Sequence, residues 1–92
     1  MATFLMIGKY SPDALGKMSP QRTQQAAELI AKHGGKVEAM YATLGDNDLV
    51  FVLDFPGTAE AMQASVGLSK LTGIGFSTSP AVTVDEFDKL MG

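Results

Sequence analysis

The chain has no cysteine, no tryptophan and a single histidine among its 92 residues. Without cysteine it can form neither a disulfide nor a thiolate nucleophile. Cysteine and histidine are the usual ligands of protein-bound zinc, so a zinc site of the ordinary kind is not expected. The sequence therefore predicts no metal site, and no motif in it calls for a cofactor.

Basic residues are scarce and scattered. Seven Lys and Arg stand against ten Asp and Glu, which gives a net charge of −3. Nucleic-acid-binding modules carry a basic face, so we expect no nucleic-acid partner. No apolar run approaches the roughly 20 residues of a membrane helix, and the N-terminal stretch lacks the basic segment of a signal peptide. We therefore expect a cytoplasmic protein with no membrane partner.

Hydrophobic residues, by contrast, are abundant for so short a chain, at 46%. A chain of this length forms one domain, here residues 1–92, and such a small domain buries only a modest fraction of its surface. Association with further copies is a common source of extra stability at this size. The composition therefore favours a homo-oligomer.

Caps, turn residues and apolar alternation predict the order of the elements. Ser19 followed by Pro20 is typical of a helix start, Thr58 is expected to cap a second helix, and Thr83 with Glu86 forms a capping box for a short last helix. The predicted elements are a strand over 3–10, a loop over 11–18, a helix over 19–33, strands over 36–44 and 48–54, a helix over 58–69, a strand over 74–82 and a helix over 83–91.

This order is βαββαβ with a terminal helix, an α+β pattern of the ferredoxin-like kind. Right-handed crossovers place the first and third strands in the middle of a four-stranded antiparallel sheet, in the order 4-1-3-2, with both long helices on one face. Pro80 cannot donate a ladder hydrogen bond, so the fourth strand belongs at an edge.

The two central strands are apolar on both faces, as the run Leu49 to Leu53 shows. A strand of this kind must be covered on both sides. The two helices cover one side, and nothing else in the chain is large enough to cover the other. We therefore expect a homodimer or higher homo-oligomer that forms through the open face of the sheet.

Two assignments of side chains to faces follow from spacing alone. Strict alternation along the second strand places its odd-numbered residues on one face, namely Val37, Ala39, Tyr41 and Thr43. Helical spacing predicts an inward stripe on the second long helix, which consists of Ala59, Met62, Val66 and Ser69 and is widened by Ala61, Ala64 and Leu68.

The stretch Gly45-Asp46-Asn47-Asp48 joins the second and third strands and has two interpretations. Gly, Asp and Asn are ordinary residues of a tight turn. Alternatively, the two carboxylates serve as a general base or a cation site, although calcium needs six or more oxygens. Asp48 is the stronger candidate of the two acids because it begins a central strand.

Five other residues are candidates for binding or chemistry. Tyr10 and Tyr41 either pack in the core or an interface, or line a pocket and orient a polar ligand together. His33 ends the first long helix, where it is either a surface residue or a general base or haem ligand. Lys9, with Arg22, could hold an anion, or it could pair with Asp54 on the neighbouring strand.

Several of these residues carry a resemblance to a known family. Gly34-Gly35-Lys36-Val37, Tyr41 and Thr43-Leu44-Gly45-x-x-Asp48 resemble the GYD domain family, small proteins of largely unassigned function, and the resemblance covers nearly the whole chain. It implies the dimeric α/β barrel type of ferredoxin-like fold. The chain departs from the family pattern at Asn47, where a tyrosine is expected, so any contact that this tyrosine makes is lost.

The sequence leaves two classes of function open. One is a small homo-oligomeric protein that binds a small molecule or regulates, with Tyr10, Tyr41, Lys9, Asp46 and Asn47 as the expected ligand-binding residues. The alternative is a cofactor-independent monooxygenase or isomerase that acts on a small activated organic substrate. In the alternative, Asp48 or His33 is the base and a tyrosine polarises the substrate.

Overall fold

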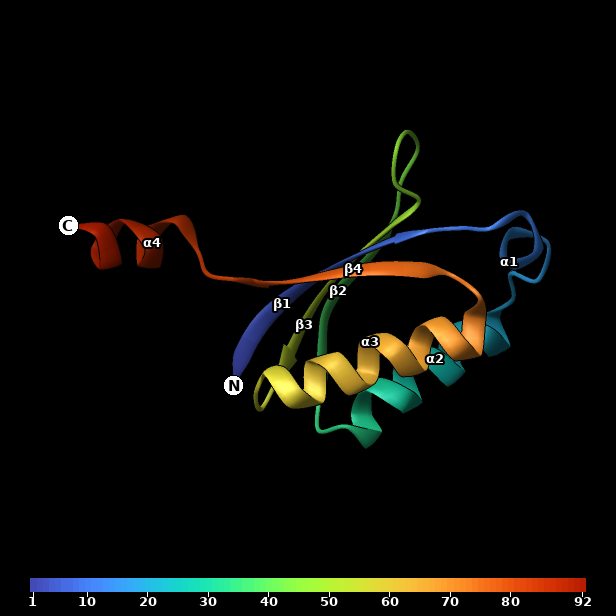
Figure 1. Ribbon diagram of the computed structural model, residues 1–92, viewed down its shortest axis with the longest axis horizontal. Coiled ribbons are helices and arrows are strands. Elements are labelled where there is room, and N and C mark those ends of the chain that lie inside the picture. Colours follow the sequence, from blue (N-terminus) through green and yellow to red (C-terminus); the bar gives the residue numbers. More distant parts are fainter.

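A computed structural model describes residues 1–92, and its chain forms one sheet with four helices (Figure 1). The elements in chain order are β1 Ala2–Lys9, α1 Pro12–Gly16, α2 Pro20–Lys32, β2 Lys36–Ala42, β3 Leu49–Phe55, α3 Thr58–Thr72, β4 Gly75–Ala81 and α4 Val84–Met91.

The sheet is antiparallel throughout, with the strand order β2-β3-β1-β4. This is the predicted order 4-1-3-2 read from the opposite edge. The central positions of β1 and β3 are confirmed, as is the edge position of β4, the strand that contains Pro80. The arrangement is that of a βαββαβ ferredoxin-like sheet.

The core lies between the sheet and the helices α2 and α3, which cover the same face (Figure 1). Alternation along the strands turns one set of side chains toward these helices. The strand side of the core consists of Phe4, Met6, Phe51, Leu53 and Phe55, all buried. The rings of Phe4 and Phe55 meet edge to face, with their centroids 6.0 Å apart.

Helix α2 begins as predicted. Ser19 is the N-cap, its hydroxyl oxygen accepts a hydrogen bond from the Arg22 amide at 3.1 Å, and Pro20 occupies the first turn. The same signal, Ser11 followed by Pro12, starts the short helix α1, where the Ser11 hydroxyl accepts from the Ala14 amide at 3.1 Å. The prediction of a loop over 11–18 was therefore wrong, although its N-cap signal was present in the sequence.

Helix α3 differs from the prediction in its cap and its buried face. Its N-cap is Gly57, without a side-chain cap, and Thr58 is already inside the helix. The residues that it buries are Ala61, Ala64, Leu68 and Thr72. Met62 and Val66 are 63% and 56% exposed, so the predicted inward stripe through them was wrong. The small alanines allow the helix to approach the sheet closely. Because the face that carries Ala61 and Ala64 is buried, the larger side chains of Met62 and Val66 are turned outward.

The opposite face of the sheet carries no helix (Figure 1). The side chains on this open face include Leu5 and Ile7 of β1 and Val50 and Val52 of β3, which the register sets side by side. These four aliphatic residues are only half-buried. The prediction that one face of the sheet is left uncovered by its own chain is confirmed.

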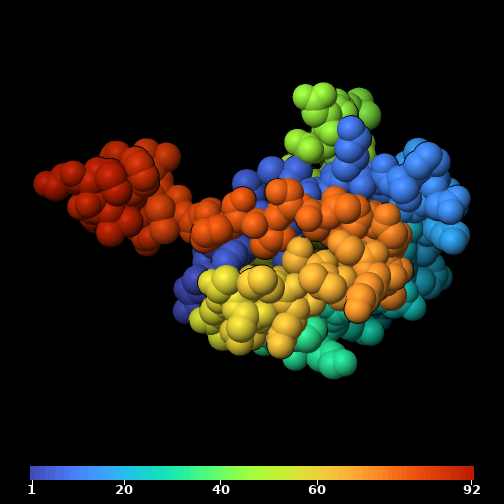
Figure 2. Space-filling model, viewed as in Figure 1, coloured from blue at the N-terminus to red at the C-terminus, as the bar shows by residue number.

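Two parts of the chain project from the body, the β2–β3 connection and α4 (Figures 1 and 2). Thr83 caps α4 as predicted, because its hydroxyl oxygen accepts from the Glu86 amide at 3.1 Å. No residue of α4 is buried, and Phe87 is 51% exposed. No helix of the chain has the length and apolar character needed to cross a membrane.

Candidate functional site

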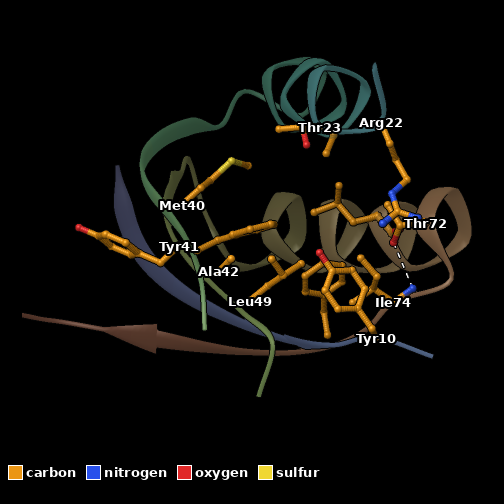
Figure 3. Close-up of a pocket in the computed structure, with 13 residues that line it drawn as sticks. Tyr10, Arg22, Thr23, Met40, Tyr41, Ala42, Leu49, Thr72 and Ile74 are labelled. Carbon is orange, nitrogen blue, oxygen red and sulfur yellow. Dashed lines mark hydrogen bonds between the residues drawn. The ribbon is translucent and has the colours of Figure 1, made fainter. Parts of the chain in front are cut away.

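A pocket of about 280 Å³ opens between the sheet and the helices, at the end of the sheet where β1 ends and β3 and β4 begin (Figure 3). Most of its lining is apolar and includes Met40, Leu49, Phe51, Leu68, Ile74 and Phe76. The rings of Phe51 and Phe76 pack against each other, with centroids 5.6 Å apart. The volume is at the small end of the range for ligand pockets.

Gly8 helps to shape this wall of the pocket. It pairs with Phe76 in the β1–β4 register, and a Cβ at Gly8 would lie 2.8 Å from the Phe76 ring. A side chain at this position would displace the ring, because real Cβ atoms do not approach carbon so closely. The absence of a side chain therefore allows the Phe76 ring to lie over β1.

Tyr10, Arg22 and Thr23 line the mouth of the pocket, and the buried Thr72 adds a hydroxyl to its wall. The Arg22 guanidinium lies 5.9 Å from the centroid of the Tyr10 ring and donates one hydrogen bond, from Nη1 to the Ala14 carbonyl oxygen at 2.8 Å. The Tyr10 hydroxyl points into the pocket (Figure 3). The mouth therefore offers a cation and a phenol beside an apolar interior.

Asp48 holds Tyr10 in place. Its carboxylate oxygen Oδ2 accepts a hydrogen bond from the Tyr10 amide at 2.8 Å, and its own amide donates to the Gly8 carbonyl oxygen at 2.9 Å. Its carbonyl oxygen accepts from the Thr43 amide at 2.8 Å. Asp48 thus fastens the end of β1 to the β2–β3 connection, and it does not line the pocket.

Tyr41 lies at the edge of the pocket, but its ring points away from the interior (Figure 3). A bulge between Val37 and Ala39 shifts the β2 register, so Met40 pairs with Phe51 on the core side and Tyr41 pairs with Val50 on the open face. The predicted alternation, which put Val37 and Tyr41 on the same face, was wrong because the bulge adds one residue. Tyr41 is 60% exposed and does not meet Tyr10.

The structure separates the other predicted residues from the pocket. His33 is the C-cap of α2, eleven residues beyond Arg22, which is about 16 Å along a helix. Lys9 is exposed, because alternation turns it to the face opposite Tyr10. Asp46 and Asn47 are exposed in the projecting connection. No three His, Cys, Asp or Glu side chains come together anywhere in the chain.

The predicted pairing of Lys9 with Asp54 is wrong. In the β1–β3 register Asp54 is opposite Thr3, at the other end of the strand from Lys9. The Thr3 hydroxyl donates to Asp54 Oδ1 at 2.7 Å and is the main cause that holds the pKa of Asp54 below its usual value, with smaller contributions from Glu38 and Lys36.

The comparisons with known proteins agree with this architecture. A family model described as the GYD domain matches residues 4–91. The chain belongs to the GYD domain family. No curated protein matches it.

Two solved structures resemble the fold of this GYD domain. One is the Leucine response regulatory protein (LrpA) of Mycobacterium tuberculosis, with a TM-score of 0.59 and 8% sequence identity over 90% of this chain and 51% of that one. The other, described as a Glu104Ala mutant, has a TM-score of 0.58 and 10% identity over the same shares. The chain spans about half the length of these proteins, and at such low identity the likeness shows the fold alone.

The connection that carries the family resemblance in this GYD domain is a turn. Gly45 has φ +123°, a value that side chains rarely adopt, and the Thr43 hydroxyl donates to the Asn47 carbonyl oxygen at 2.7 Å. Asn47 itself, at the position where the family has tyrosine, is exposed. The polar residues before Asp48 in this turn are exposed and do not line the pocket, whereas the Asp48 carboxylate turns back to the Tyr10 amide.

Sequence reasoning missed most of the pocket lining. No pattern in the sequence assigned Ile74 or Phe76 to a site, and Arg22 was a candidate only beside Lys9. One signal could have found Arg22: it is the sole arginine of the chain and occupies the first turn of a helix whose next inward residue is Ala26. The small alanine leaves the space into which the pocket extends.

Proposed function

We propose that this GYD domain binds a small molecule in the pocket at the end of the sheet and works as a homo-oligomer that forms through its open sheet face. The observation that carries the first part is the pocket itself, a mainly apolar cavity with a cation and a phenol at its mouth. Ligand sites commonly combine a mainly apolar lining with a few placed polar groups.

The open face supports the second part of the proposal. Four half-buried aliphatic side chains lie there in adjacent positions on β1 and β3, with Tyr41 beside them on β2. A second copy packed sheet against sheet would cover them, in the manner of a dimeric α/β barrel. Contiguous apolar surface of this kind is typical of an interface between proteins.

A regulatory role also has a physical basis in β2. The adjacent residues Met40 and Tyr41 point to opposite faces, Met40 into the pocket and Tyr41 onto the open face. A ligand that displaces the Met40 side chain would move the strand that also carries the proposed interface. One structural neighbour is named a response regulatory protein, and its name is consistent with such a role here.

The enzyme alternative receives less support from the pocket. A cofactor-independent oxygenase or isomerase needs a base within reach of its substrate. The two residues proposed as base, Asp48 and His33, do not line the pocket, and no Asp, Glu or His does. The Tyr10 hydroxyl is the group that a catalytic role would have to use.

A blocked pocket tests the binding proposal. Thr23 is exposed at the mouth, so Thr23→Phe should close the entrance while the fold is retained. The measurement is NMR screening of the full chain against a mixture of neutral and charged fragments, together with native mass spectrometry for retained ligand. The matched control is Gln24→Phe, one residue further on the exposed side of α2. Fragment binding that survives Thr23→Phe, or is lost equally in both variants, would contradict the proposal.

A further inference from the structure

We infer that the ligand of this pocket is a small carboxylic acid with a compact apolar body, and that Arg22 binds its carboxylate. The inference rests on the proposed function, because it names the chemical class of the molecule that the pocket binds. It follows from the charge at the mouth, the size of the cavity and the absence of acidic groups in the lining.

The charge at the mouth has no anionic partner in the chain. The one ion pair of the protein joins Lys36 to Glu38, so no carboxylate lies within 4.0 Å of the Arg22 guanidinium. Arg22 has five N–H donors, of which one donates to the Ala14 carbonyl oxygen. A half-buried cation beside an apolar cavity is costly unless it is paired. A ligand anion would supply the missing partner.

The geometry of the mouth suits a carboxylate. A guanidinium fork matches the two oxygens of a carboxylate with two parallel hydrogen bonds. The Ala14 carbonyl oxygen and the Tyr10 ring both hold the guanidinium in place. The side chain is therefore already ordered, and ligand binding costs less conformational entropy. The Tyr10 hydroxyl, which points into the pocket, is a further donor for the same group (Figure 3).

The rest of the cavity limits the size and the polarity of the part of the ligand beyond the carboxylate. A volume of 280 Å³ equals the share of roughly nine liquid water molecules, which corresponds to a ligand of roughly ten non-hydrogen atoms. The walls beyond the mouth are aliphatic and aromatic apart from Thr72, whose hydroxyl is already bonded to the backbone of the same chain. The rings of Phe51 and Phe76 pack together on one side. An aromatic or branched aliphatic body fills such a space, and a charged or sugar-like body does not.

The lining also favours binding of acids without an ammonium group over binding of amino acids. None of the lining residues is Asp or Glu, so an α-ammonium group would have no anionic partner. Burial of an unpaired ammonium opposes binding. We therefore expect 4-methylpentanoate to bind more tightly than leucine, which has the same branched body and carboxylate with an added ammonium.

The experiment titrates the full wild-type chain with matched probes, by NMR and calorimetry. The pairs are phenylacetate with phenylacetamide and 4-methylpentanoate with its amide, which differ mainly in charge. A hydrogen bond to a charged group predicts that each acid binds about 10- to 100-fold more tightly than its amide. Arg22→Gln should abolish this preference, and Arg22→Lys should keep part of it. Lys9→Gln removes a positive charge outside the pocket and should leave the preference intact.

Four results would overturn the inference. The first two are equal binding of acid and amide to wild type, and binding of leucine as tight as that of 4-methylpentanoate. The third is a loss of acid binding in Lys9→Gln as large as that in Arg22→Gln. The fourth is that neither acid binds at millimolar concentration. Neutral fragments that still bind the pocket in these cases would leave the proposed function standing and refute only the acid. If Arg22→Gln does not fold, the inference is tested by the acid and amide pairs on wild type and by the affinity of Arg22→Lys for the acids.

Discussion

Replacement of Asp48 separates its structural role from the catalytic role that the sequence allowed. Asp48→Ala removes the acceptor of the Tyr10 amide and leaves that N–H without its partner at the end of a central strand. Asp48→Asn keeps an oxygen acceptor in the same place and removes only the charge. The exposed Asp46, two residues earlier in the same connection, offers a matched control as Asp46→Ala.

The magnitude follows from the contact at 2.8 Å between Tyr10 N and Asp48 Oδ2. A hydrogen bond to a charged acceptor stabilises a protein by about 1.5–3 kcal/mol, and half-burial of Asp48 brings the expected loss in Asp48→Ala to about 1–2 kcal/mol. Total stabilities of about 0.05–0.15 kcal/mol per residue mean that this is a large share for so small a domain. The melting temperature should fall by roughly 4–16 °C.

The assay is urea and thermal unfolding of the four proteins at one fixed protein concentration, since association makes apparent stability depend on concentration. We expect the loss in free energy of unfolding to be less than half as large in Asp48→Asn as in Asp48→Ala. The free energy of unfolding of Asp46→Ala should stay within about 0.5 kcal/mol of wild type. The mouth of the pocket should also loosen in Asp48→Ala, because Tyr10 loses its anchor, and binding of any pocket ligand should weaken.

Two outcomes would refute this reasoning. Asp48→Ala with the stability of wild type would show that the hydrogen bond to Tyr10 contributes nothing. Asp48→Asn with wild-type stability and ligand affinity, but without a turnover that wild type shows, would establish Asp48 as a base rather than a positioning residue.

Two further predictions concern the open face and the far end of β1. Val52→Lys places a charge among the aliphatic side chains of the open face and should convert the proposed oligomer to monomers, as measured by light scattering. The control Met62→Lys, on the exposed side of α3, should leave the oligomer intact. Oligomers in both variants would contradict the proposed interface. Thr3→Val removes the hydrogen bond that lowers the pKa of Asp54. The folded pKa lies below the unfolded one, so this stabilisation is present above about pH 4 and is lost as pH falls through the folded value. The difference in stability between Thr3→Val and wild type should therefore be present near neutral pH and disappear in acid, and a pH-independent difference would contradict this origin.

Local signals in the sequence account for most of the fold. Ser19-Pro20 and Thr83 start helices where predicted, Pro80 places β4 at an edge, and the double-sided apolarity of residues 49–53 identifies a central strand. These signals act over a few residues, through backbone dihedral preferences and hydrogen bonds to nearby amides, so they can be read without knowledge of the rest of the chain. The missed helix α1 carries the same kind of signal at Ser11-Pro12.

The candidate site was much less predictable. Of the residues expected to bind a ligand, Tyr10 points into the pocket and Arg22 lines its mouth, whereas Tyr41 is turned to the open face by a single bulge in β2. A bulge inserts one residue into a strand of period two and so exchanges the faces of every residue beyond it. Its position depends on pairing with β3, which the alternation of β2 alone does not reveal.

The sequence by itself determined the order of the elements, the central place of β1 and β3 and the uncovered face of the sheet, because hydrophobic pattern and backbone preferences are local properties. Only the tertiary structure decided what the polar residues around the pocket do. It brings the Asp48 carboxylate to the Tyr10 amide across 38 positions, and it places Arg22 over the Tyr10 ring at the mouth of an apolar cavity. Such contacts depend on how helices and strands distant in sequence pack together, and packing is set by the whole core.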